Sequence, residues 1–348
     1  MKKFDSRKKI VFFGFIAFIT LFLQATSVEP PDDKLIEFDG CTSVLVGKLA
    51  SVDGSTMTSH SCDSGTDRTW INVVPRIKHK PGDMCTVYYH SKRTKGPDHP
   101  DRLPKGKIPQ VAETYAYINT AYAVINEYQL AIGETTFGGR RELVSSEGIL
   151  DAPELYRLCL ERAKTAREAI KVVDELTKEF GYIDVGECFT FADPKEVWFF
   201  EILGPGKGRK GAVWAAARIP DDEIAVSANG CRIREIDLKD KDKFMASNNA
   251  YSLAEEMGWW DPKSGKPFEF CYAYAPETRT SLGTRLREWR VLSWLAPSLN
   301  LNPYSENYPL SIKPDEKVSI PDILEIFRDA YDGTNFDITK QMMTSNSK

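Results

Sequence analysis

Alternation of apolar and polar residues predicts short β-strands along much of the chain. Runs of strand length that are rich in aliphatic side chains lie at residues 41–46, 213–217 and 224–228. Two further pairs of runs are each joined by polar turn residues. One pair, 121–125 and 130–136, flanks Asn126-Glu127, and the other lies within 188–203 and turns at Asp193-Pro194-Lys195. The pattern therefore predicts antiparallel hairpins.

A helical period appears in two other segments. Asp151 is a good N-cap residue, Glu154 completes a capping box, and apolar residues then recur at helical spacing as far as Gly181. Ser319 opens a second helix, whose apolar face is followed by Gly333. No internal repeat is present. Together with the hairpins, these helices predict an α+β fold.

The N-terminal residues have the organisation of a secretory signal. Five basic residues within positions 2–9 precede an unbroken apolar run over 10–23, and small residues follow it. The run is shorter than the roughly 20 residues that a membrane-spanning helix needs, which favours cleavage over an uncleaved anchor. We expect a signal peptide at 1–27, a short pro-segment at 28–40, a catalytic domain at 41–340 and a tail at 341–348. This organisation predicts an exported protein that is periplasmic, cell-surface or extracellular, with no membrane attachment once the signal is removed.

Composition and charge narrow the classes of function. The 348 residues carry a formal net charge of -4, and the basic cluster belongs to the apparent signal, so a nucleic-acid partner is not expected. The glycine-rich stretch 204–211 lacks the Gly-Lys-Ser/Thr ending of a phosphate-binding loop and is interpreted as a hairpin loop. All four histidines lie between His60 and His99 without a recognised metal-binding spacing, so no metal site is predicted.

The chain contains seven cysteines, an odd number, so at least one thiol has no partner within the chain. The six cysteines other than Cys41 could form disulfides or remain buried thiols, and the sequence does not decide between these alternatives.

Many stretches, in order along the chain, resemble one known family. The segment that begins Cys41-Thr42-Ser43-Val44-Leu45-Val46-Gly47-Lys48 is followed by Asp53-Gly54-Ser55-Thr56. The further matching stretches lie at 131–134, 213–216, 218–222, 227–229, 232–237, 256–259, 261–267, 287–292 and 296–301. Together they resemble the PepD-type cysteine dipeptidases, a branch of the N-terminal-nucleophile (Ntn) hydrolases, from Cys41 to about Lys340.

The resemblance implies a fold and a mechanism. The fold would be an αββα sandwich, in which two antiparallel sheets lie between helical layers. Cys41 would be the nucleophile, and its α-amino group, freed by removal of the pro-segment, would be the general base, since the reference pKa of such a group is about 7.7–8.0. Small peptides would be hydrolysed through an acyl-thioester, without a cofactor.

The family pattern also implies roles for other residues. Asp63 matches an acidic residue that holds the nucleophile's amino group, and Asn229 matches a side chain that donates a hydrogen bond to the oxyanion. Arg287 matches an active-site guanidinium. A backbone N–H near Glu134 and Thr135 would be the second oxyanion donor.

Two further residues are interpreted as substrate-binding groups. Glu134 could pair with the ammonium group of a dipeptide. His60 stands three residues before Asp63, where relatives often carry arginine, so this departure bears on substrate preference more than on catalysis.

Two alternatives remain open at this point. The chain could be an Ntn acylase that acts on non-peptide amides, or a non-catalytic relative that retains the fold. The resemblance fades after the helix near 323–331, where relatives generally continue, so the chain is expected to be a short or a C-terminally truncated member. A homo-oligomer is also left open, because missing strands would expose apolar surface.

Overall fold

The computed structural model describes residues 40–62, 70–89 and 103–340. The chain divides into two units, Met1–Ile36 and Glu37–Lys348, and all described residues belong to the second. The predicted signal peptide, the pro-segment up to residue 39, Asp63 and the tail at 341–348 lie outside the described residues. Within the described ranges, no helix combines the length and apolar character needed to cross a membrane.

Two antiparallel sheets form the centre of the fold. The larger sheet has eight strands, in the order β15 (Phe244–Ala246), β13 (Val213–Ile219), β12 (Val197–Leu203), β11 (Gly186–Ala192), β10 (Ala131–Gly138), β9 (Ile125–Asn126), β8 (Tyr117–Asn119) and β3 (Asn72–Val74). The smaller sheet has four, in the order β16 (Ser311–Ile312), β14 (Ile224–Ser227), β1 (Ser43–Val46) and β2 (Met57–Thr58). Two short ribbons pair β4 (Ile77–Lys78) with β7 (Glu113–Thr114) and β5 (Met84–Tyr88) with β6 (Pro104–Pro109).

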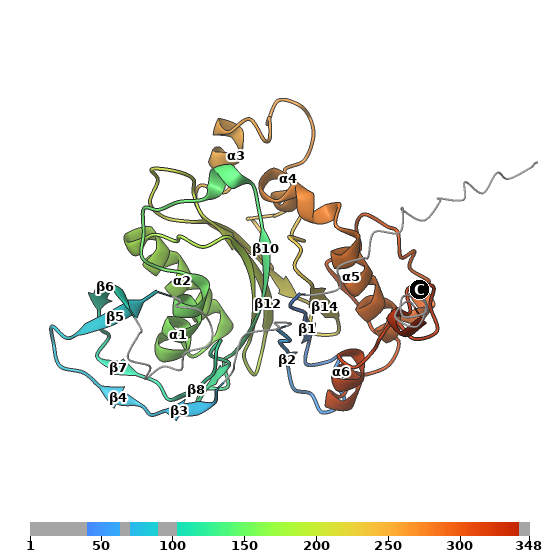
Figure 1. Cartoon of the computed structure of the whole chain (residues 1–348), viewed down its shortest axis with the longest axis horizontal. Coiled ribbons are helices and arrows are strands. Elements are labelled where there is room, and N and C mark those ends of the chain that lie inside the picture. Colours follow the sequence, from blue (N-terminus) through green and yellow to red (C-terminus); the bar gives the residue numbers. More distant parts are fainter. Residues whose placement is uncertain (1–39, 63–69, 90–102, 341–348) are drawn as a thin grey trace, which may run out of the picture. The chain divides into compact units, whose positions relative to one another are not determined.

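Helices cover the outer face of each sheet. The α-helices are α1 (Ala152–Arg162), α2 (Ala166–Phe180), α3 (Ser252–Glu256), α4 (Phe270–Tyr274), α5 (Leu282–Leu295) and α6 (Ile320–Ile326). Short 3₁₀ turns lie at Arg141–Leu143, Pro276–Arg279 and Pro297–Leu299. In Figure 1, α1 and α2 lie on one side of the β10 and β12 strands, and α5 and α6 lie beyond β1 and β14.

Strand β12 shows why both faces of the larger sheet are covered. Its side chains alternate, and Phe199 packs with Leu45 of β1 and Ala225 of β14 in the core between the sheets. Trp198 and Phe200 point to the opposite face and pack against the helical layer of α1 and α2. This strand, which is apolar at every position except Glu201, is thus buried on both faces. The hairpin predicted within 188–203 is confirmed as β11 and β12.

The smaller sheet has its own helical cover. Val44 of β1 and Val226 of β14 form a third core with Val291 of α5 and Ile323 of α6. The order of layers is therefore helices, sheet, sheet, helices. This arrangement confirms the predicted α+β class with antiparallel sheets.

The single helix predicted from Asp151 to Gly181 is wrong in one respect, because the structure has two helices there. Asp151 caps α1 as expected and accepts a hydrogen bond from Glu154 N at 3.2 Å. Ala163 is extended, with φ -115° and ψ 148°, and Thr165 then caps α2 by accepting from Glu168 N. Thr165, as a second N-cap residue, competes with continuation of α1. The helix therefore ends here, although the apolar period of the sequence continues.

The hairpin predicted around Asn126-Glu127 forms with a shifted turn. Ile125 pairs with Ala131, and the turn reaches Gln129, which has a positive φ of 63°. Asn126 belongs to strand β9, and its buried side chain accepts from Leu130 N and donates to Leu160 O of α1. The turn therefore covers 127–130, one residue beyond the predicted 126–129, and Asn126 is held in β9 by its contact with α1.

Candidate active site

Cys41 lies directly before a central strand. Strand β1 pairs with β14 on one side and with β2 on the other, and Cys41 precedes its first residue by two positions. The residue is buried, with 6% of its surface exposed, and its thiol donates to Glu134 Oε1 over 3.7 Å. The strand thus holds the sulfur at one end of the smaller sheet, facing β10 of the larger one.

The surroundings of the Cys41 thiol oppose its ionisation. A hydrogen bond with Cys62, burial, and the negative charge of Glu134 together raise the pKa of Cys41 well above its usual range. Cys62 is partly buried. In this form of the chain the sulfur is a protonated thiol at neutral pH. A base must therefore take its proton when it attacks a carbonyl.

Glu134 connects Cys41 to a second buried carboxyl group. Its Oε1 atom also lies 3.1 Å from His60 Nε2. Glu187, on the neighbouring strand β11, accepts from Thr136 Oγ1 at 2.8 Å. Burial, and next the charge of Glu134, raise the pKa of Glu187 well above its usual range. Glu187 therefore favours its neutral, protonated form beside Glu134 and the thiol.

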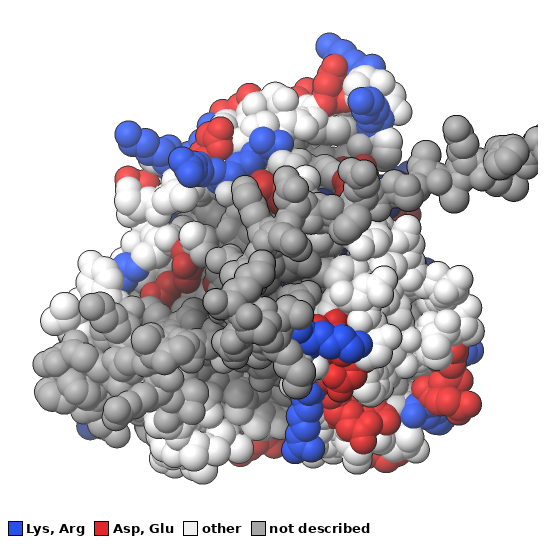
Figure 2. Space-filling view, turned by 45° about the vertical axis from the view of Figure 1, so that its right-hand side comes forward, with Lys and Arg blue, Asp and Glu red and all other residues white. Residues whose placement is uncertain are grey.

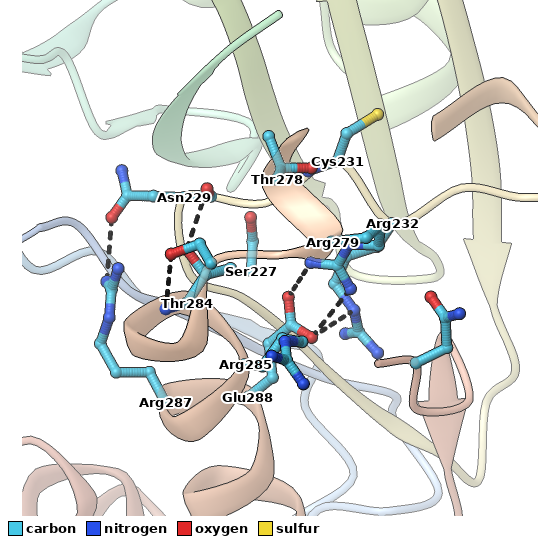
Figure 3. Close-up of polar contacts among 12 residues, drawn as sticks. Ser227, Asn229, Cys231, Arg232, Thr278, Arg279, Thr284, Arg285, Arg287 and Glu288 are labelled. Carbon is cyan, nitrogen blue, oxygen red and sulfur yellow. Dashed lines mark hydrogen bonds and ion pairs between the residues drawn. The ribbon is translucent and has the colours of Figure 1, made fainter. Parts of the chain in front are cut away.

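Asn229 and Arg287 lie together beside Cys41, and Figure 3 shows their side chains pointing toward each other. Arg287, from α5, donates through Nη1 to Cys41 O at 2.6 Å and to Asn229 Oδ1 at 2.9 Å. Asn229 Nδ2 donates to Thr136 O of β10. Because Arg287 engages the carbonyl oxygen of the Asn229 side chain, the orientation of that amide is fixed.

A buried ion pair supports the loop that carries Asn229. Arg279 and Glu288 form two hydrogen bonds, of 3.1 and 2.7 Å, and both side chains are almost completely buried. A Cβ atom on Gly230 would lie 2.4 Å from Arg279 Nη2, so only glycine fits against this pair. Thr284 Oγ1 donates to Asn229 O at 3.4 Å (Figure 3). Asn229 itself has a φ of 59°, a left-handed conformation that asparagine tolerates better than most residues.

Gly40 is pressed against the same two side chains. A Cβ atom at this position would lie 2.2 Å from Asn229 Oδ1 and 3.0 Å from Arg287 Nη2, and the φ of Gly40 is 146°. The Gly40–Cys41 peptide bond therefore lies beside the thiol, Asn229 and Arg287, and the residue that precedes Cys41 has no room for a side chain.

A cavity of about 670 Å³ adjoins this group of residues. Its lining includes Thr136 and Glu187 from the site, together with Tyr122, Asp151 and Asp184. The space is large enough for a small molecule, and Lys105 lines it together with the acidic residues. On the face shown in Figure 2, acidic and basic side chains of the described residues are interspersed.

The structure brings together most of the residues that the sequence predicted. Cys41 contacts Glu134 and Arg287, which in turn contact His60 and Asn229, respectively. The hydroxyl group of Thr135 instead bonds Ser227 Oγ at 2.5 Å, in the contact between the sheets. Asp63 cannot be placed, because it lies outside the described residues.

Sequence reasoning missed two residues beside the thiol, Cys62 and Glu187. The spacing of His60 and Cys62 was a usable signal, because side chains two apart in an extended segment point to the same side. Cys41, His60 and Cys62 each offer a donor atom, and these atoms lie within 4.8 Å of one another. No metal site was predicted because the histidines have no recognised metal-ligand spacing along the sequence.

Comparison with known proteins assigns the chain to a class. A buried cysteine before a central strand, with a glycine peptide bond beside it, defines a candidate thiol-dependent site in a layered α+β fold. The chain belongs to peptidase family C69, whose family model matches residues 40–348. The family inferred from the sequence motifs is thereby confirmed.

Relatives in this family carry dipeptidase names. A probable dipeptidase of Salmonella dublin is 28% identical over 318 residues, which cover 85% of this chain and 68% of the relative. A probable dipeptidase of Latilactobacillus sakei is 27% identical over 87% of this chain and 63% of its own length. A dipeptidase of Bifidobacterium longum is 26% identical, over 85% and 60%, respectively. The chain thus spans about two thirds of the length of these relatives.

Proposed function

We propose that this chain is a cysteine-type dipeptidase that hydrolyses small peptides, with Cys41 as an N-terminal nucleophile. One observation carries the proposal: the Gly40–Cys41 peptide bond lies beside the Cys41 thiol and against Asn229 and Arg287. A peptide bond that is cleaved to make Cys41 the new N-terminus would have to lie beside the groups that cleave it. Family membership and the dipeptidase names of relatives support the same reaction.

The order of layers supports an Ntn-hydrolase αββα fold. Two antiparallel sheets stack between helices, and the proposed nucleophile begins a central strand of one sheet. In such a fold the nucleophile becomes the first residue of the mature chain. Removal of a signal at 1–27 and a pro-segment at 28–40 would leave Cys41 at that position, in an exported enzyme.

Freeing the α-amino group would supply the base that the thiol needs. The pKa of Cys41 is raised by its hydrogen bond with Cys62, by burial and by Glu134, so attack requires proton removal. An α-amino group has a reference pKa near 8 and would lie on the same residue as the sulfur. Asp63 is proposed to hold that amino group.

Asn229 is proposed to stabilise the oxyanion that forms when the thiol attacks. An amide nitrogen carries two hydrogens, and Thr136 O accepts one of them, so the second can be donated to the developing charge. Arg287 would keep the amide in this orientation. Collapse of the intermediate would release the leaving amine and leave an acyl-thioester on Cys41, which water then hydrolyses. No step requires a cofactor.

The substrate is proposed to be a small peptide whose ammonium group binds at Glu134. That carboxyl lies next to the thiol, and the cavity that Glu187 helps to line offers space for the rest of a small peptide. His60, 3.1 Å from Glu134 Oε1, would adjust the preference among substrates. Thr135 would contribute through its backbone near the oxyanion.

The test combines maturation and activity of the exported chain. We expect intact mass and N-terminal sequencing to show a mature chain that begins at Cys41. Alkylation of this chain should abolish dipeptide hydrolysis. Cys41→Ser should keep the fold, measured by circular dichroism, and lose most of the activity. Cys271→Ser, at a buried cysteine in the core of the protein, is the control for loss of a thiol.

Two results would contradict the proposal. Hydrolysis of N-acylated small amides without hydrolysis of dipeptides would indicate an acylase instead. A chain that keeps Cys41 internal and cleaves neither substrate class would indicate a non-catalytic relative.

A further inference from the structure

Four donor atoms from separate parts of the chain converge at Cys41. The Cys41 and Cys62 sulfurs and a ring nitrogen of His60 lie within 4.8 Å of one another. Glu134 Oε1 lies 3.7 Å from Cys41 Sγ and 3.1 Å from His60 Nε2. Among the described residues, Cys41, His60 and Cys62 form a group of three side chains whose donor atoms are close enough together to bind one metal ion.

The backbone explains why the two cysteines meet. Thr42 and Ser61 form an antiparallel bridge, with Thr42 N donating to Ser61 O at 3.3 Å and Ser61 N to Thr42 O at 2.9 Å. In this register residue 41 lies opposite residue 62, and side chains directly opposite on antiparallel segments are close neighbours. Strand β10 then brings Glu134 against the pair. The cluster is therefore built into the contact between the two sheets.

The separations suit a tetrahedral ion with little movement. Zinc binds sulfur at about 2.3 Å and nitrogen or oxygen at about 2.0 Å, so two donors on one tetrahedral zinc lie roughly 3.3–3.8 Å apart. The distances from Glu134 Oε1 to the other donors, 3.7 and 3.1 Å, are close to this range. Small side-chain rotations would bring the remaining donors, now within 4.8 Å, to the same spacing.

The types of ligand in the pocket also favour a cation. Cys41 is buried, and Glu134 is 1% exposed. Thiolate and imidazole ligands are preferred by zinc over magnesium or calcium, which take oxygen ligands. A bound cation would offset the desolvation of the carboxylate and would allow both thiols to ionise.

We propose that Cys41, His60, Cys62 and Glu134 form a zinc-binding site that occupies the nucleophilic sulfur. Binding would release the proton of each thiol and form two sulfur–zinc bonds, one nitrogen–zinc bond and one oxygen–zinc bond. Four protein ligands leave no open position on a tetrahedral ion, so the site is inhibitory and not catalytic. The geometry of the site does not depend on the proposed peptidase activity, whereas the inhibition does.

The test uses the purified, reduced full chain after treatment with a chelator. Zinc is titrated in competition with a chromophoric chelator, and Co²⁺ serves as a spectroscopic probe. We expect one ion per chain, with thiolate-to-cobalt charge-transfer absorption and the intense ligand-field bands of tetrahedral cobalt. Zinc should also inhibit dipeptide hydrolysis, and the chelator should restore it.

Cys62→Ser tests the metal site through zinc affinity alone, whatever it does to hydrolysis. This variant should bind zinc more weakly, by more than the roughly 100-fold that loss of an outer-shell partner can cost. The control is Cys85→Ser, at another buried cysteine, whose sulfur accepts from Arg157 Nη1. It should bind zinc as the parent does.

The site is overturned if cobalt shows no sulfur charge transfer, or if Cys62→Ser binds zinc as tightly as the parent. A Cys41–Cys62 disulfide that survives reduction would overturn it too. Cysteine-dependent zinc binding in a chain that hydrolyses no dipeptide would support the metal site and contradict only the peptidase function.

Discussion

At the scale of single residues, Arg287 organises the candidate site. Its guanidinium contacts the backbone carbonyl of Cys41, the hydroxyl of Thr42 and the side-chain carbonyl of Asn229. One guanidinium nitrogen, Nη1, thus contacts both the segment that carries the proposed nucleophile and the amide proposed to stabilise the oxyanion.

Asn229 allows a test that separates chemistry from backbone strain. Asn229→Ala and Asn229→Gly both remove the amide, so each should lower kcat by about 10²–10³-fold with a smaller effect on KM. Because the φ of residue 229 is 59°, glycine should restore part of the stability that alanine loses. Steady-state kinetics and thermal unfolding measure the two effects. An alanine variant with unchanged kcat would remove Asn229 from the mechanism.

Gly40 should be required for maturation. Gly40→Ala places a Cβ atom 2.2 Å from Asn229 Oδ1, so the 40–41 bond is displaced and the unprocessed chain should accumulate. Gly54→Ala is the matched control, because Gly54 also has a positive φ, 81°, but has no atom within 4 Å of the added carbon. Intact mass of the exported protein gives the readout. Equal processing of the two variants would show that the crowding is irrelevant.

At the scale of elements, N-cap residues set where the two helices that cover the larger sheet begin. Asp151 begins α1 and Thr165 begins α2, each through a side-chain bond to a backbone N–H three residues later. Asp151 is unusual because it is buried: burial, and next the charge of Glu154, raise its pKa to about 7. The surroundings of the carboxyl that caps the helix therefore disfavour its charged form.

The raised pKa of Asp151 predicts that the stability of the protein depends on pH. Below the unfolded pKa, near 3.8, both states hold the proton. As the pH rises from there to about 7, the unfolded chain loses the proton that the native carboxyl keeps, so the free energy of unfolding falls. Asp151→Asn keeps the cap without the charge, and it should weaken this fall and stabilise the protein at pH 8 by on the order of 2 kcal/mol.

Chemical denaturation at several pH values measures the effect of Asp151. Asp151→Ala is the comparison, since it removes the charge together with the cap and should cost about 1 kcal/mol relative to Asn. If the asparagine variant follows the parent at every pH, the native carboxyl is not protonated in this range.

At the scale of the whole molecule, the two sheets approach closely at the site. Gly133 of β10 marks the approach, because a Cβ atom there would lie 2.4 Å from Ser59 O and 2.6 Å from Thr190 Oγ1. Behind the site, Glu288 of α5 joins Arg279 and lies 3.6 Å from Arg232. Segments distant in sequence are therefore held together by buried charges as well as apolar cores.

Loss of the buried carboxylate should affect the entire fold. Glu288→Ala leaves Arg279 and Arg232 without their common partner in a buried position, and it should lower the free energy of unfolding by about 3–5 kcal/mol. Glu256→Ala breaks an exposed pair with Arg209 and should cost no more than about 1 kcal/mol. Urea denaturation of both variants makes the comparison. If the two variants lost equal free energy of unfolding, the buried ion pair of Glu288 would matter no more to stability than the exposed pair of Glu256.

The sequence by itself determined the features that depend on near neighbours. The apolar run of β12, the cap at Asp151 and the ordered motifs from Cys41 onward gave the α+β class and the family, because period, capping and motif order are local properties. Cys41, Asn229 and Arg287 were predicted from the resemblance of these motifs to the family, and their roles remain proposals.

Only the tertiary structure decided what depends on register and on packing between layers. It placed Cys62 opposite Cys41, Glu187 beside Glu134, and the backbone of Gly40 against Asn229. It also divided one predicted helix at Thr165. These contacts join residues whose separation in sequence carries no period, so their proximity arises only when the two sheets stack and the strands choose their register.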